Sequence, residues 1–155
     1  MFTRTVSIRQ RLDADLREAL RAGDERRKSA LRVALASLHN AEIEAGHALD
    51  DDGAIAVLAK EVKQRRESIE EFRKGNRQDL VDREEAELAS LMPYLPEQMS
   101  RQEIMNAARQ VIGEVGAAGP GDKGKVMPVL MGRLRGRADG REVNEVVTEL
   151  LSARR

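Results

Sequence analysis

The chain has 155 residues, enough for one domain or two small ones, and its 27 basic and 27 acidic side chains give a net charge of zero. It contains no cysteine, which excludes disulfides, a thiol nucleophile and structural zinc of the usual kind. Two Phe, one Tyr and no Trp weigh against a stacking platform for single-stranded nucleic acid, and they leave the core to aliphatic side chains.

Apolar residues at helical spacing dominate the first part of the chain. The pattern predicts four helices, over about 6–22, 25–45, 52–74 and 77–92. Gly23, Gly46 and Gly75 end the first three, while Asp24 and then Asp51 or Asp52 supply caps. No stretch alternates with period two, so no strand is expected.

Basic and acidic residues alternate along the third helix. A secondary basic cluster is formed by Lys63, Arg65 and Arg66. One interpretation is an anion-binding face, and the other is a solvated face in which Arg65 pairs with Glu61 at i,i+4. On the fourth helix, Glu84 is expected at the edge of the apolar face or paired with Arg77 or Arg83.

The segment Met92-Pro93-Tyr94-Leu95-Pro96 interrupts the helical pattern, because proline removes amide donors and restricts the residue before it. Ser100 and Glu103 then form the pattern of a capping box, which begins a fifth helix running to about Val115. We therefore predict an N-terminal helical domain over 1–92, a proline-rich joint over 93–99 and a three-helix domain over 100–155.

The stretch Gly119–Gly140 combines glycine, apolar and basic residues. It predicts a short amphipathic sixth helix with Pro128 in its first turn or at a kink. Arg133 and Arg135 are expected on the flanks of this helix, with Lys125 roughly opposite its apolar side. Gly136 and Gly140 are expected to form a tight link in left-handed conformations. Asp139 can cap a seventh helix.

The candidate RNA-binding residues at this end of the chain are Lys125, Arg133, Arg135, Arg137 and Arg141. Residues 99–155 hold 10 basic and 7 acidic side chains, a net of +3. Two interpretations stay open: a solvated face beside ordinary glycine turns, or a surface that binds an RNA backbone through guanidinium groups. A phosphate-binding P-loop is excluded, because its motif is absent.

Catalytic and metal-binding patterns are missing from the sequence. His39 and Glu42 share a helix, but the spacing of a di-iron bundle is not repeated. We therefore predict no catalytic residues, no metal and no cofactor. The N-terminus has no apolar core of a signal peptide, and the longest apolar run, Ala54–Ala59, is too short for a bilayer. A cytoplasmic location without membrane contact is expected.

The order of several motifs resembles the GatB/YqeY family from about Leu31 to Leu151. These motifs are Glu42-Ile43-Glu44, the run Val62–Phe72, Asp79-Leu80, Glu84–Leu88, Tyr94-Leu95-Pro96, the Gly116–Met127 loop, Gly136–Gly140 and Val143-Asn144. The resemblance implies an all-α fold, with a four-helix N-terminal domain and a three-helix C-terminal domain like the tail of the tRNA-dependent amidotransferase B subunit.

In that subunit the tail helps to hold tRNA, so the resemblance implies tRNA or a tRNA-modifying enzyme as partner. Three functions are compatible with the sequence. The first is a non-catalytic tRNA-binding accessory protein, and the second is a protein–protein interaction module. The third is a carbon–nitrogen ligase with glutamine as amido donor, which only family naming supports, because the residues show no site for that chemistry.

Overall fold

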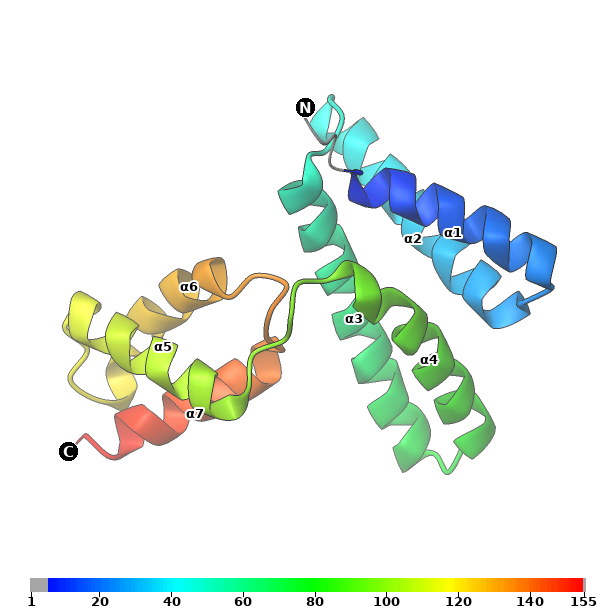
Figure 1. Ribbon diagram of the computed structural model, residues 1–155. Coiled ribbons are helices and arrows are strands. Elements are labelled where there is room, and N and C mark those ends of the chain that lie inside the picture. Colours follow the sequence, from blue (N-terminus) through cyan, green and yellow to red (C-terminus); the bar gives the residue numbers. More distant parts are fainter. Residues whose placement is uncertain (1–5, 155) are drawn as a thin grey trace. The chain divides into compact units, whose positions relative to one another are not determined.

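In the computed structural model, which describes residues 6–154, the chain forms seven α-helices and two 3₁₀ turns, with no strand in that range (Figure 1). The predicted all-α fold is confirmed. The chain divides into two compact units, Met1–Leu95 and Pro96–Arg155.

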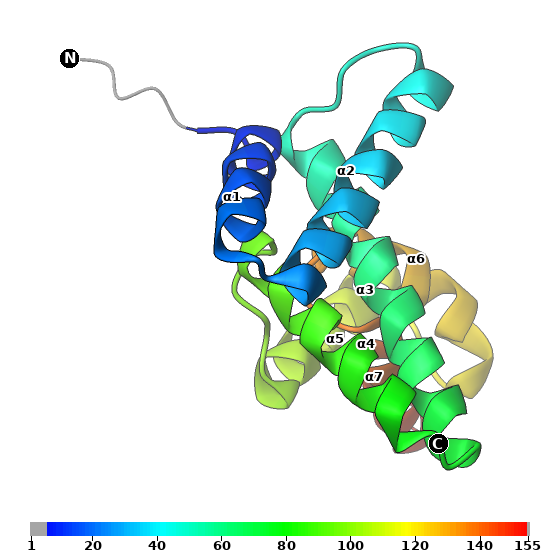
Figure 2. The same ribbon diagram turned by 90° about the vertical axis from the view of Figure 1, so that its right-hand side faces the viewer.

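The N-terminal unit contains four helices and a 3₁₀ turn. They are α1 (Ile8–Ala22), α2 (Glu25–Ala45), α3 (Asp51–Lys74), α4 (Gln78–Leu91) and η1 (Met92–Tyr94). Helices α3 and α4 lie side by side and make the most extensive contact, while α2 touches the other three helices of the unit (Figures 1 and 2). The buried core consists of aliphatic residues from all four helices, closed by Leu91 and Tyr94.

The helix ends of this unit follow from local chemistry. The Ser7 hydroxyl accepts a bond from the Gln10 amide and the Gln10 side chain bonds the Ser7 amide, so a complete capping box begins α1. Asp24 accepts from the Arg27 amide at 3.2 Å and begins α2. Gly23 and Gly46 end α1 and α2 in the left-handed conformation, with φ of 68° and 78°.

One predicted helix cap is wrong by one residue, while Gly75 ends α3 as predicted. Asp50, rather than Asp51 or Asp52, caps α3 by accepting a 2.8 Å bond from the Gly53 amide. In the turn after α3, Gly75 has a φ of −84°, and the next residue, Asn76, has the left-handed φ of 56°. Asparagine tolerates the left-handed conformation better than most residues, so Asn76 can occupy this position in the turn.

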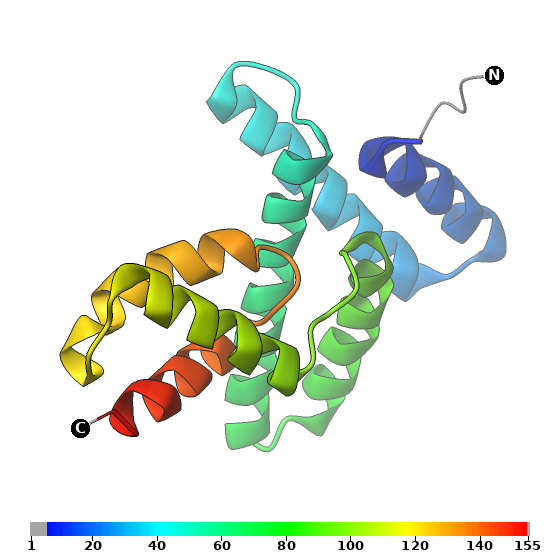
Figure 3. The ribbon, with the colours of Figure 1, turned by 60° about the vertical axis from the view of Figure 1, so that its left-hand side comes forward.

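The C-terminal unit contains three helices, α5 (Arg101–Val115), α6 (Lys123–Arg133) and α7 (Gly140–Ser152), with the 3₁₀ turn η2 (Pro120–Asp122) before α6 (Figure 3). Each helix contributes to a second buried core, whose largest members include Ile104, Ile112, Leu130 and Leu151. Ser100 accepts from the Glu103 amide at 3.2 Å, which is the first half of the predicted capping box. Each unit therefore has a core of its own.

Candidate nucleic-acid interface

Helix α6 is shorter than expected and carries its proline in an unexpected place. Pro128 lies inside the helix beyond the first turn, so the first of the two predicted alternatives, a first-turn position, is wrong. Proline has no amide to donate to the Gly124 carbonyl, but both residues are exposed, so water can hydrogen-bond that carbonyl. The backbone hydrogen bond that Pro128 removes therefore lies on the solvent-exposed side of α6.

The chain between α6 and α7 is a turn held by hydrogen bonds, and we call residues 134–139 the arginine turn. Gly136 is buried and has a φ of 76°, whereas Gly140 is the first residue of α7 and shows no positive φ. The Gln98 side chain donates to the Gly136 carbonyl at 2.8 Å, and the Met99 amide donates to the Arg137 carbonyl at 2.8 Å. The segment before α5 therefore fixes the backbone of the arginine turn.

Arg135 and Arg137 project from this turn. Both are exposed, and neither side chain has a hydrogen-bond or ion-pair partner within residues 6–154. Helix α6 ends at Arg133, so the expectation that Arg135 lies on a helix flank is wrong. Two unpaired guanidinium groups on a fixed backbone can donate paired hydrogen bonds to phosphate oxygens.

Lys125 and Arg133, in contrast, are matched by acids. The Lys125 ammonium lies 3.4 Å from the Asp122 carboxylate, and Arg133 lies 2.5 Å from Glu114 on α5. The hydrogen bond from Arg133 lowers the pKa of the Glu114 carboxyl. The pKa of Asp122 is also lowered, first by a bond from the Ala118 amide and then by Lys125. These two cations thus contribute less net positive potential than an isolated lysine or arginine.

Arg141 is exposed in the first turn of α7. Its backbone amide donates to the Asp139 carboxylate at 3.2 Å, which confirms Asp139 as the cap of this helix. The five candidate residues therefore differ in their contacts: two have no partner among the described residues, two are ion-paired, and Arg141 follows at the start of α7.

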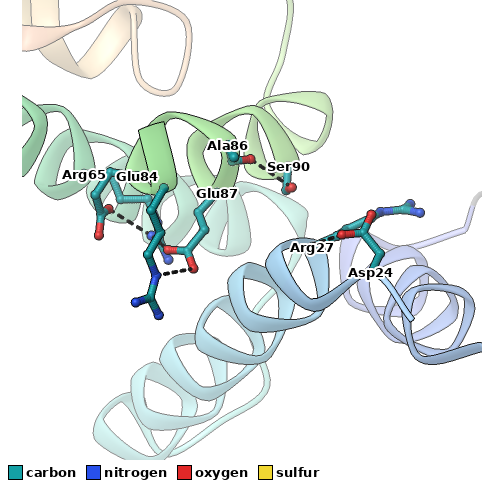
Figure 4. A network of polar contacts seen from close by, with 8 residues as sticks. Asp24, Arg27, Arg65, Glu84, Ala86, Glu87 and Ser90 are labelled. Atoms are coloured by element: carbon teal, nitrogen blue, oxygen red, sulfur yellow. Dashed lines mark hydrogen bonds and ion pairs between the residues drawn. The ribbon is translucent and has the colours of Figure 1, made fainter. Parts of the chain in front are cut away.

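The secondary basic cluster is divided in the same way. Lys63 is exposed and Arg66 is half-buried, but Arg65 is buried and bonds Glu84 and Glu87 on α4 (Figure 4). The predicted Glu61–Arg65 pair does not form, because Glu61 accepts from the Ser37 hydroxyl on α2. Glu84 likewise does not pair with Arg77 or Arg83, and Arg77 pairs with Asp79 instead. Arg65 is therefore a structural residue and is not accessible to RNA.

Sequence reasoning missed two features of these surfaces. Gln98 positions the arginine turn, but no local pattern marks it, since the Gly136 carbonyl that it bonds lies 38 residues further along the chain. The basic residues Arg26, Lys28 and Arg32 were also not singled out, although their clustering at the start of α2 is visible in the sequence. They line a groove beside α4.

Within 6–154, no three His, Asp or Glu side chains are grouped so that they could hold a metal ion. His47 is exposed and its ring lies 2.9 Å from the Ala48 carbonyl oxygen, and His39 is exposed on α2. In the same part of the chain, every helix is too short or too polar to cross a bilayer.

This chain is similar to one protein family and to several named proteins. The family described as "Yqey-like protein" matches residues 9–151. A protein of Pyrenophora tritici-repentis named "Altered inheritance of mitochondria protein 41, mitochondrial" is 31% identical over 150 residues, which cover 93% of this chain and 81% of the relative. The resemblance seen in the sequence is confirmed.

Proteins of the same name in two yeasts match over shorter regions. The relative from Lachancea thermotolerans is 44% identical over 85 residues, 54% of this chain and 46% of its own length. The relative from Saccharomyces cerevisiae strain YJM789 is 35% identical over 95 residues, 61% of this chain and 50% of its own. The chain thus spans about half the length of these two relatives.

The names of these relatives overturn one expectation. A cytoplasmic location was expected from the sequence, but the matched relatives are named as mitochondrial proteins, so that expectation is wrong. It rested on the lack of a long apolar segment. Such a lack does not distinguish one aqueous compartment from another.

Proposed function

The chain belongs to the family of YqeY-like proteins, and from that premise we propose that its C-terminal unit binds the phosphate backbone of tRNA as a non-catalytic accessory module. The observation that carries the proposal is the arginine turn, in which Arg135 and Arg137 are exposed and have no partner among residues 6–154, on a backbone held by Gln98 and Met99. The net charge of +3 over residues 99–155 supports it.

The interaction we propose is electrostatic and independent of base sequence. Guanidinium groups contact phosphate oxygens, and each contact releases condensed counterions, so binding weakens as salt rises. The fixed turn reduces the conformational entropy lost on binding. Only a few phosphates are engaged, so we expect a log–log salt slope of about −2 to −4.

The test compares two double variants of the full chain, each of which removes two positive charges. One is Arg135→Gln with Arg137→Gln, and the other is Lys125→Gln with Arg133→Gln. Filter binding of tRNA across a salt series is the measurement. We expect the first variant to bind more weakly and to flatten the slope by about 1.4 to 1.8. The second should lose less, because its cations already have acidic partners.

Equal losses in both variants would mean that bulk charge, and not the arginine turn, determines binding. A wild-type chain without salt-dependent tRNA affinity would end the RNA proposal and favour the protein–protein alternative. A pull-down with and without ribonuclease then separates the two, since a docked protein survives the nuclease.

The proposal assigns no reaction to this chain. A transamidation requires groups that release ammonia, activate a carboxyl group and transfer the nitrogen, and the sequence has neither a cysteine nucleophile nor a P-loop. We expect the pure protein to show no glutamine hydrolysis. Steady ammonia release by preparations free of other amidotransferase subunits would contradict this.

A further inference from the structure

A groove of about 570 Å³ lies in the N-terminal unit, away from the residues discussed so far. The first turns of α2 contribute Arg26, Lys28, Arg32 and Val33, and α4 contributes Arg83 and Glu87. Four of the lining residues are basic and two are acidic, the second acid being Glu25. The volume falls within the range of sites for small molecules, about 300 to 1,000 Å³.

The acids of the groove already have partners. Glu25 pairs with Lys28 at 2.6 Å within the first turn of α2. Glu87 is buried, and its carboxylate accepts a hydrogen bond from Arg65, which does not line the groove. Lys28 and Arg65 therefore balance these two carboxylates, which leaves Arg26 and Arg32 available for a ligand.

Three arginines of the groove are free or loosely held. Arg26 and Arg32 are exposed and have no ion-pair or hydrogen-bond partner in the described part of the chain. The Arg83 guanidinium is 61% exposed and lies 3.9 Å from the Glu87 carboxylate, too far for a hydrogen bond. These three arginines line one concave surface, and two of them have no acidic partner among the described residues. Such an arrangement favours an anionic ligand.

We propose that this groove binds a compact small molecule carrying several phosphate groups. Arg26 and Arg32 are six residues apart on one helix, about 9 Å along its axis, so their guanidinium groups can contact more than one phosphate group. A ligand with several linked phosphates can reach both and Arg83. The guanidinium fork matches phosphate oxygens in pairs, and Val33, which is 41% exposed, offers an apolar contact at the edge.

The proposal is tested with inorganic tripolyphosphate as the probe. Backbone amide resonances of the ¹⁵N-labelled full chain are followed by NMR during a titration at constant ionic strength. We expect shifts at residues 25–33 and around Arg83, with saturation at a single dissociation constant. Absence of saturable shifts in these segments at millimolar probe, or saturable shifts confined to residues 123–141, would overturn the proposal.

Two variants with the same loss of charge decide whether the groove itself is responsible. Arg26→Gln with Arg32→Gln removes the unpaired arginines of the groove. Arg17→Gln with Arg21→Gln removes two exposed arginines of α1 that lie outside it. None of the four has a partner within residues 6–154, so both variants should fold, which circular dichroism checks.

We expect the groove variant to weaken tripolyphosphate binding about tenfold or more and the α1 variant to change it less than about twofold. Equal weakening in both would show a general charge effect and refute the site. If the groove variant instead keeps its affinity for tripolyphosphate but loses tRNA binding, the groove contacts RNA and the small-molecule proposal is wrong.

Discussion

Arg65 on α3 donates a hydrogen bond to Glu87 on α4, and both side chains are buried. Glu84 accepts a second bond from the same guanidinium nitrogen at 3.1 Å. The Arg65 Nε atom is buried without a partner among the described residues. Burial makes such a pair costly to break, because the remaining charge is left in a medium of low dielectric constant.

Replacing Arg65 by methionine should therefore lower the free energy of unfolding by about 3 kcal/mol, because the buried Glu87 keeps only the exposed Arg83, 3.9 Å away, as a cation nearby. Urea denaturation is the measurement. Arg73→Gln is the matched control, since Arg73 pairs with Glu85 across the same two helices but at the surface. The Arg73→Gln variant should lose less than about 0.5 kcal/mol in its free energy of unfolding. Arg65→Met with Glu87→Met should recover much of the stability, and a double variant weaker than the single would contradict this interpretation.

Two glycines near the arginine turn should respond in opposite directions to alanine. Gly136 has a φ of 76°, so Gly136→Ala should cost about 1 to 2 kcal/mol of stability. Gly132 lies in α6, and a Cβ there meets no atom within 4 Å, so Gly132→Ala should stabilise by about 0.5 to 1 kcal/mol. Denaturation curves of both variants give the comparison, and stabilisation by Gly136→Ala would show that the turn is not held as described.

Tyr94 should titrate late in the folded protein. Burial is the largest cause and the hydrogen bond to Asp15 the next, and together they raise its pKa from the ordinary value of 10.0 to about 12. The folded state then keeps this proton while the unfolded state releases it, so stability falls as pH rises from about 10 to 12. The chain has one tyrosine, so the ultraviolet absorbance of tyrosinate reports this residue alone.

Asp15→Asn removes the charged partner of Tyr94 and should lower its pKa in the folded protein only part of the way toward 10, since burial is the larger cause. Arg17→Gln, on the same helix, is the control and should leave the titration unchanged. A wild-type midpoint near 10 under folded conditions would show that Tyr94 is open to solvent.

The two units should separate under limited proteolysis. Each has its own core, and the chain passes between them near Pro96. Because the Gln98 side chain and the Met99 amide are bonded to the arginine turn, we expect the first cut near Glu97, on the N-terminal side of those bonds. A protease of broad specificity and mass spectrometry of the fragments test this. Early cuts inside residues 55–72 would count against independent units.

The sequence alone determined the helices and most of their ends. Caps and stops depend on residues within one turn of each other, as with Ser100 and the Glu103 amide or Gly46 at the end of α2. Apolar spacing indicated the buried face of most helices, but on α4 the buried residues are Val81, Glu87 and Leu91. The motifs also identified the family, because their order along the chain does not depend on the fold.

The tertiary structure decided which charges are paired. Arg65 has an acid at i−4, yet packing of α3 on α4 directs it to Glu84 and Glu87. Arg133 is matched by Glu114 on another helix, whereas Arg135 lies past the helix end and has no partner in the described part of the chain. Helical spacing indicates which residues of one helix are neighbours. A guanidinium group also reaches acids on any element packed beside it, and the packing of these elements is determined by burial of the cores.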